Sequence, residues 1–376
     1  MKARELLLKT VVFYLLFYIC RFSFFSIMPI VAEELGLTHM SLAWISSILF
    51  VGYAVMLIPS GFLADKYNPV NVLLTGSIIS SSSNMLMALA ASEDWLKILM
   101  FINGIGQGMG WAPLIKLLTV KMDKAKIGLA IGFLMSSAVI GPSIAYTVAS
   151  IIAYISNWKM SLIIPALVLL AYSTTFRRMK TVSESTELSL NCIKNANAWL
   201  IGFSYLFFYA VYRGFLVWMP TFLYEKTGLY LFSSIYSSIL SATGALSGYI
   251  GYYLSLKLYK GKMKKIIAYS MLAAILPCLA LSYEGNNIYL LTWLFAFYFL
   301  LSLPLWLFFI YPPKIFPMKV VGTITGFIDS LGYLGNFTGT LILGLAYSVS
   351  TTGRELFYLM AVLLLAGSTF SLFIRE

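Results

Sequence analysis

Apolar runs of about 20 residues alternate with short polar connections, and this alternation constrains the fold more than any other feature. Runs of this length cross a bilayer as α-helices. Hydrophobic residues make up 60% of the 376 residues and charged residues 11%, against about 45–50% and about 25% in soluble domains. We therefore predict an all-α membrane protein with twelve transmembrane helices, at residues 9–32, 41–63, 70–91, 96–120, 127–154, 158–177, 198–222, 231–256, 265–283, 288–311, 322–348 and 354–374.

A single long polar interval divides these runs into six and six. It covers residues 177–197 and is rich in Ser, Thr, Glu, Asn and Lys. We expect an N-terminal six-helix bundle in residues 1–176, a cytoplasmic linker in 177–197 and a C-terminal six-helix bundle in 198–376. Such a pair of pseudo-symmetric bundles is typical of secondary transporters that rock one half against the other around a midplane site.

Lysine and arginine are distributed unequally between the connections, which predicts the orientation. With the N-terminus inside the cell, 19 of the 26 basic residues fall in cytoplasmic segments and only four in outer loops. Cytoplasmic loops of membrane proteins carry this excess of positive charge. We therefore predict a multi-pass plasma-membrane protein with both termini cytoplasmic, in contact with the lipid bilayer. The net charge of +12 is assigned to these loops and not to nucleic-acid binding.

The sequence offers no motif of an enzyme. Cys20, Cys192 and Cys278 lack the paired spacing of a metal or redox site. There is no serine, histidine and carboxylate set and no phosphate-binding P-loop, so we expect neither catalysis, nor a cofactor, nor ATP hydrolysis. The one histidine, His39, is expected to be a solvated residue of the first outer loop.

Arg21 lies in the middle of the first apolar run. An arginine at the centre of a spanning helix costs roughly 2.5 to 3.5 kcal/mol on insertion scales, so it should face protein or a water-filled cavity. Such a residue is a functional candidate by default. Arg213 occupies a similar place in the seventh run, one position past the slot of Arg21 when Met28-Pro29 is aligned on Met219-Pro220. The same alignment pairs Tyr14 with Tyr205 and Tyr18 with Tyr209, which suggests two walls of one anion site.

The inner turn and several further motifs resemble the major facilitator superfamily, and within it the organophosphate:phosphate antiporter family. The turn is Gly61-Phe-Leu-Ala-Asp65-Lys66, and the other matching segments are Tyr14, Tyr18, Arg21 and Met28-Pro29; Asn68-Pro69; Gly106-Gln-Gly-Met-Gly-Trp111-Ala-Pro113; Arg213, Trp218 and Pro220-Thr221; Gly322-Thr-Ile-Thr-Gly-Phe327; and Gly332-Tyr-Leu-Gly335. The resemblance covers nearly the whole chain. It implies that Arg21 and Arg213 hold a phosphate at the base of a central cavity.

The chain also departs from that family. Phe22 stands where the family often has a second basic residue after the first-helix arginine. Glycerol-phosphate members have a lysine where Leu57 aligns and a histidine where Ser137 aligns, and they lack the aspartate Asp329. The site is therefore expected to carry fewer positive charges, and the substrate is left open.

A guanidinium presents five donors in a planar fork that matches two oxygens of a phosphate or carboxylate. Two such groups would neutralise a phosphate dianion. The alternative is that each arginine pairs with a carboxylate or with backbone carbonyls and holds helices together. The predicted substrate-binding residues are Arg21, Arg213, Tyr14, Tyr18, Tyr209, Tyr333, Gln107, Trp111 and Ser137.

Asp329 is the one acidic residue embedded in the predicted spans, and three roles are open for it. It could pair with Arg213 or Arg21, take up a proton that couples transport to the proton gradient, or act as a hydrogen-bonded packing residue. Lys116 lies one turn from the end of its span and can reach the interface. Asp65 and Lys66 are predicted to form a conformational latch at the inner turn.

The predicted function is a secondary active transporter for a small organic anion. We favour an organophosphate exchanged for inorganic phosphate by rocker-switch alternating access, in a monomer. One alternative is a proton-coupled symporter of carboxylates or sugar acids that uses Asp329. Another is a sensor that binds a phosphate ester without moving it.

Overall fold

The computed structural model describes residues 3–122, 124–177, 179, 194–283, 288–316, 318–349 and 354–375. Nearly all of them are helical. Two compact units form: unit 1 comprises Met1–Leu37, Trp44–Glu187 and Leu229–Ser238, and unit 2 comprises Thr38–Ala43, Leu188–Gly228 and Ile239–Glu376. The predicted division at the central linker stays a prediction, because most of residues 177–197 lie outside the described part.

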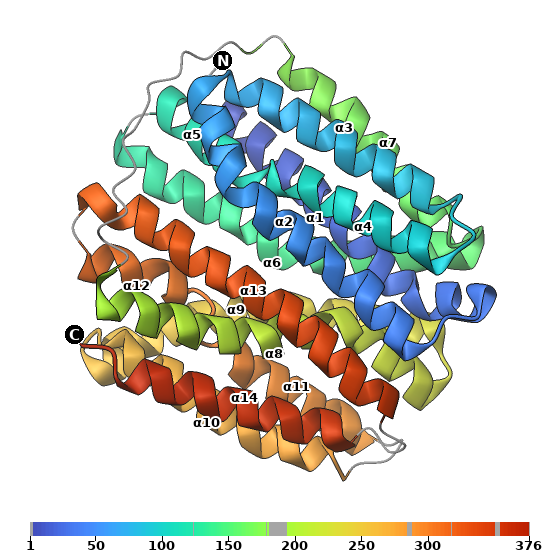
Figure 1. The fold of residues 1–376 in the computed structure, drawn as a ribbon. Helices are drawn as coiled ribbons and strands as arrows, with labels where there is room; N and C mark the ends of the chain where they lie inside the picture. The colour runs from blue at the N-terminus through green and yellow to red at the C-terminus, as the bar shows by residue number, and fades with distance from the viewer. Residues whose placement is uncertain are drawn as a thin grey trace. The chain divides into compact units, whose positions relative to one another are not determined.

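The helices follow the order of the predicted spans (Figure 1). Those of the first half are α1 (Ala3–Leu35), α2 (His39–Lys66), α3 (Pro69–Met87), α4 (Glu93–Gly108), α5 (Trp111–Lys121), α6 (Lys124–Ile155) and α7 (Met160–Ser173), followed by the 3-10 turn η1 (Thr174–Phe176). Those of the second half are α8 (Ala196–Thr227), α9 (Tyr230–Tyr259), α10 (Met263–Leu281), α11 (Ile288–Ser302), α12 (Leu307–Ile315), α13 (Met318–Val349) and α14 (Arg354–Leu372).

The fourth and tenth predicted spans are each broken into two helices. Between α4 and α5, Met109 and Gly110 make tight i to i−3 bonds, and Pro113 has no N–H to continue the helical ladder. Between α11 and α12, Pro304 interrupts the ladder in the same way. Counting each broken pair once, the described helices correspond to the twelve predicted spans.

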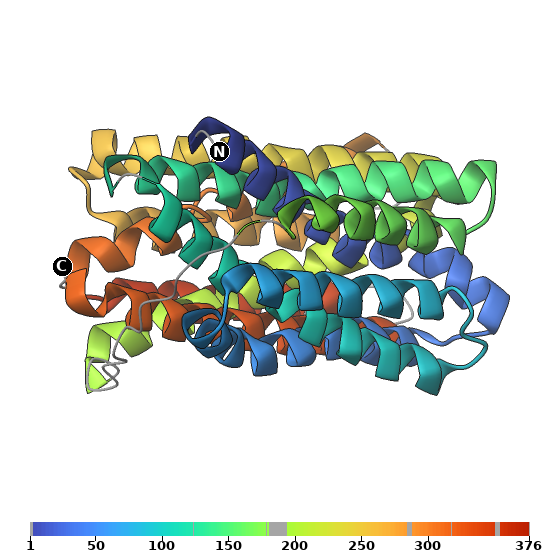
Figure 2. The ribbon, with the colours of Figure 1, turned by 90° about the horizontal axis from the view of Figure 1, so that it is seen from above.

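Eight of these spans are long and apolar enough to cross a membrane by length and composition alone, within the described residues. The helix α3 does not meet this criterion because it carries the polar run Ser80-Ser-Ser-Ser-Asn84. In unit 1, α3 and α4 run side by side (Figures 1 and 2), and this run is buried except for Ser82, which is exposed. The polar run thus provides buried hydrogen-bonding groups.

Each arginine-bearing helix packs along a partner in parallel register. In unit 1, α1 packs on α6: Ser137 bonds the backbone at Val11, and Gly141 contacts Tyr18. In unit 2, α8 and α13 lie side by side (Figure 1), with Gly335 against the backbone of Leu206. Close helix approach at small residues is typical of membrane bundles.

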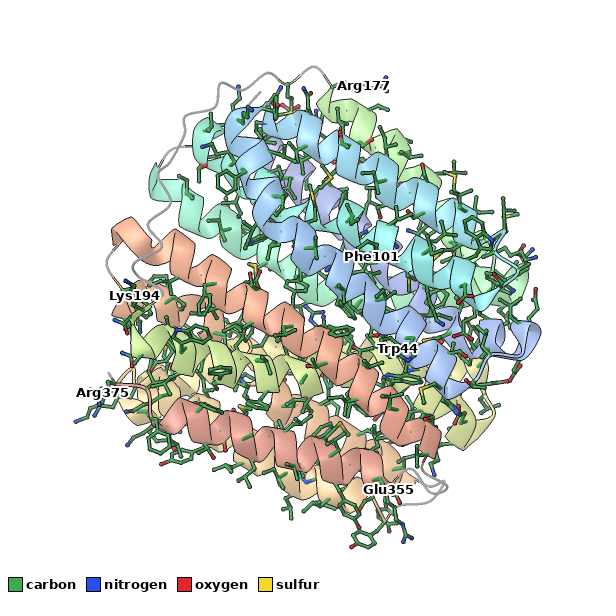
Figure 3. The ribbon with its side chains drawn as sticks, viewed as in Figure 1. Trp44, Phe101, Arg177, Lys194, Glu355 and Arg375 are labelled. Carbon is green, nitrogen blue, oxygen red and sulfur yellow. The ribbon has the colours of Figure 1, made fainter. Side chains whose placement is uncertain are left out.

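Charged side chains mark the ends of each unit (Figure 3). In unit 1, Arg177 lies beyond the end of α7, away from Trp44 in the first turns of α2. In unit 2, Lys194 and Arg375 share one end, and Glu355 at the start of α14 lies at the other. Asn197, near the start of α8, connects that helix to the C-terminal residues at this end. Its side-chain amide donates to the carbonyl of Arg375 and accepts from the backbone N–H of the same residue.

Candidate functional site

The guanidinium of Arg21 is buried within unit 1 and is held by an amide. Arg21 is 2% exposed on α1, and its Nε donates to Oε1 of Gln107 on α4 at 3.0 Å. Gln107 is fully buried. The bond joins Arg21 on α1 to α4 through a neutral amide.

Two aromatic rings lie beside the same guanidinium. Its Cζ lies over both rings, 4.5 Å from the ring centre of Tyr18 and 4.6 Å from that of Tyr53. Both tyrosines are buried. A ring face attracts a cation more strongly where water is excluded. Arg21 therefore contacts one tyrosine that the sequence predicted and one that it did not.

Tyr53 comes from α2, and glycines explain how it reaches Arg21. Added side chains at Gly104 and Gly108 would collide with the backbone of α2 around Leu49 and Tyr53. The helices α2 and α4 therefore approach each other at backbone distance, which places Tyr53 next to Gln107. A single tyrosine in an apolar run is too common to have indicated this role from the sequence.

Three further predicted residues lie along the same face of α1. The ring of Tyr14 is 5.7 Å from that of Trp111 on α5 and meets Tyr18 edge-on at 5.1 Å. Ser137 donates its hydroxyl to the carbonyl of Val11 at 3.1 Å. Tyr14, Trp111 and Ser137 therefore lie around α1, and Ser137 uses its hydroxyl to join α6 to α1; their role in substrate binding stays a prediction.

Unit 2 presents a second buried guanidinium. Arg213 on α8 is 5% exposed, and its Cζ lies 5.6 Å and 5.5 Å from the ring centres of Tyr209 and Tyr212. Tyr209 in turn lies 4.2 Å, centre to centre, from Tyr205. An arginine with buried tyrosines on one side therefore recurs in the second half, as the repeat predicts.

Asp329 and Tyr333 lie nearer the beginning of α8 than Arg213 does. Gly332 contacts Tyr205, and Asp329 and Tyr333 interact electrostatically with Tyr205. Gly214, next to Arg213, instead contacts Thr340. Thr340 is eleven residues further along α13 than Asp329, which is about 16 Å of helix at 1.5 Å per residue. The register thus sets Asp329 well apart from Arg213 along the helix axis.

The inner turn is held by a residue that carried no predicted role. Asn68 caps α3 by accepting from the N–H of Val70 at 3.0 Å, and its amide donates to the carbonyl of Met179 at 3.1 Å. Lys66, the last residue of α2, is exposed beside the ring of Tyr67. The side chain of Asp65 lies outside the described residues, so the predicted latch stays a prediction.

His39 differs from its expectation as a solvated loop residue. It is the first residue of α2, belongs to unit 2 and bonds Oε1 of Glu225 at 2.7 Å. The other oxygen of Glu225 accepts from the hydroxyl of Tyr347. This cluster could not be predicted from the sequence, because His39 and Tyr347 are 186 and 122 residues away from Glu225.

Long apolar helices, two broken spans and buried arginines within the helices indicate a polytopic membrane protein. The chain belongs to the Major Facilitator Superfamily, which its residues 10–340 match. This confirms the predicted fold class and the prediction that the chain is not an enzyme.

Two curated relatives extend the comparison. The probable sulfoacetate transporter SauU of Cupriavidus necator is 26% identical over 414 aligned positions, covering 100% of this chain and 94% of the relative. A probable hexose phosphate transport protein of Chlamydia trachomatis is 23% identical over 372 positions, covering 86% of this chain and 80% of the relative. The second relative agrees with the predicted resemblance to organophosphate:phosphate antiporters.

One solved structure shows the same fold at low identity. It is a bacterial homolog of the human lysosomal transporter Spinster, with a TM-score of 0.79 and 16% identity, covering 99% of this chain and 94% of that one.

Proposed function

We propose that this protein exchanges a small organophosphate for inorganic phosphate across the plasma membrane by alternating access. The observation that carries the proposal is the setting of Arg21: a buried guanidinium whose Cζ lies over two tyrosine rings and whose Nε donates to an amide. A fork held in this way is suited to binding two oxygens of an anion. The relative named as a probable hexose phosphate transport protein supports this class of substrate.

Arg213 supplies the second positive charge in the proposal. It is as deeply buried as Arg21 and also has tyrosine rings beside it. Two permanent cations balance a phosphate dianion, whereas their desolvation without an anion is costly. A transporter built in this way changes conformation more readily when loaded, which favours exchange over empty return. We further propose both termini in the cytoplasm, a monomer, and a latch at Asp65 and Lys66.

Exchange in proteoliposomes tests the proposal directly. Vesicles preloaded with inorganic phosphate should take up labelled glycerol phosphate or hexose phosphate, and vesicles without internal phosphate should not. Uptake should persist when an ionophore dissipates the proton gradient. If no phosphate ester exchanges with internal phosphate while the purified protein is folded, the substrate assignment is wrong.

A second candidate function is proton-coupled uptake of an organic acid, with Asp329 as the proton acceptor. Two observations favour considering it: the register sets Asp329 apart from Arg213, and the relative that spans the whole chain is named as a probable sulfoacetate transporter.

The variant Asp329→Asn separates the two functions. For the exchanger, we expect phosphate-dependent exchange to stay within about twofold of wild type, because asparagine is similar in size to aspartate and the register sets Asp329 apart from Arg213 along the helix axis. For the symporter, uptake driven by a proton gradient should be lost, while gradient-independent counterflow of substrate should remain. The measurement is uptake of labelled phosphate esters and of sulfoacetate with and without the gradient. Loss of phosphate exchange in this variant would count against the first function.

A further inference from the structure

A continuous line of buried hydrogen bonds leads away from Arg21 into the interface of α3 and α4. Gln107 accepts from Arg21 and donates through Nε2 to Oγ of Ser80 at 2.8 Å and to the carbonyl of Phe17 at 3.1 Å. Ser80 then donates to Oδ1 of Asn103 at 2.7 Å. Ser80 and Gln107 are 0% exposed and Asn103 is 1% exposed.

All of these bonds point in the same direction. Arg21 can only donate, so Gln107 must turn its oxygen toward Arg21 and its nitrogen toward Ser80 and Phe17. The hydroxyl of Ser80 accepts from Gln107 and is therefore directed toward Asn103. Bonds aligned in one direction polarise and strengthen one another. If the amide of Gln107 turned over, two donors would face each other at Arg21.

The packing of α3 on α4 fixes these groups in place. A side chain added at Gly106 would collide with the backbone at Ser80 and Gly76. The two helices therefore approach at backbone distance one residue before Gln107. Ser80 has little room to move away from its two partners, so its hydroxyl holds the amide of Gln107 in a fixed orientation.

We propose that Ser80 and Asn103 are positioning residues for substrate binding. They act through Gln107, which fixes Nε of Arg21 and hence the direction of the remaining four N–H groups of the fork. On this assignment Gln107 orients Arg21 and is not itself a substrate ligand. The inference rests on the proposed function, because it assumes that Arg21 binds the transported anion.

The test compares two serines of the same helix. Ser80→Ala breaks the line, whereas Ser77→Ala is a matched control, because Ser77 is equally buried but bonds only the carbonyls of its own helix. In Ser80→Ala we expect KM for phosphate exchange to rise about fivefold to tenfold with Vmax within about twofold. Ser77→Ala should keep the wild-type KM. Ser80→Thr, which keeps a hydroxyl, should restore it.

Three results would overturn the inference: an unchanged KM in Ser80→Ala, an equal rise in Ser77→Ala, or a fall in Vmax alone. The wild-type protein is measured first with phosphate esters, sulfoacetate and glucuronate. If only an acid is carried, the exchanger proposal fails, and the same KM comparison is made with that acid. A crystal structure of Ser80→Ala supplies a readout without substrate: the inference requires the bond between Arg21 and Gln107 to be lost or the amide to turn over, and an unchanged bond would refute it.

Discussion

Replacing Arg21 by lysine is expected to lower phosphate exchange at least about 100-fold while leaving the protein folded. Lysine keeps the positive charge, but it is a point charge with three rotating donors and no planar fork. It cannot retain the Nε bond to Gln107 or the contact of the guanidinium carbon with the rings of Tyr18 and Tyr53. Two lost charge-assisted hydrogen bonds to the anion, at about 1.5 kcal/mol each, correspond to this loss.

The matched control is Arg177→Lys. Arg177 is exposed beyond the end of α7 (Figure 3), so the same chemical change there should leave exchange unaltered. The measurement is labelled phosphate exchange in proteoliposomes, with size-exclusion profiles to show that each variant is folded. If Arg21→Lys kept wild-type exchange, charge alone would suffice and the oriented fork would have no role in transport.

The residues of this site that could be predicted are those that stand out within the sequence of a single helix. An arginine inside an apolar run is costly in lipid, and that cost singled out Arg21 and Arg213. Tyr14 and Tyr18 followed from their repeat in the second half, and all four side chains lie buried. Tyr53 and Ser80 carried no comparable signal. An apolar run tolerates a tyrosine or serine for many reasons, and their contacts with the site depend on how α2 and α3 pack on α4.

The same distinction holds for the fold. Span positions follow from local hydrophobicity, so the twelve predicted runs correspond to the observed helices. The breaks in the fourth and tenth spans were not predicted, because a glycine or proline such as Gly110, Pro113 or Pro304 is compatible with an unbroken membrane helix as well as with a break. The position of Asp329 along the helix axis, relative to Arg213, depends on the register between α8 and α13. That register becomes visible only when Gly332 is found against Tyr205, two residues far apart in the chain.

The helices α13 and α8 approach each other at backbone distance at Gly339. An added Cβ at this position would fall on the backbone of Ala210, well inside contact distance. Because backbone atoms cannot swing aside as a flexible side chain can, a larger residue must push the two helices apart. Ala210 lies one turn of α8 before Arg213, so the displacement would also move that guanidinium.

Gly339→Val is therefore expected to lower the melting temperature of the purified protein by about 1 to 4 °C, since overpacking costs about 1 to 3 kcal/mol. Exchange should fall with it. Gly326→Val on the same helix is the control, because nothing lies within 4 Å of an added Cβ there. Its melting temperature should equal that of the wild type, because valine has a higher helix propensity than glycine. Equal melting temperatures for the two variants would mean that α8 and α13 do not depend on contact at Gly339, and the register that separates Asp329 from Arg213 would have to be reconsidered.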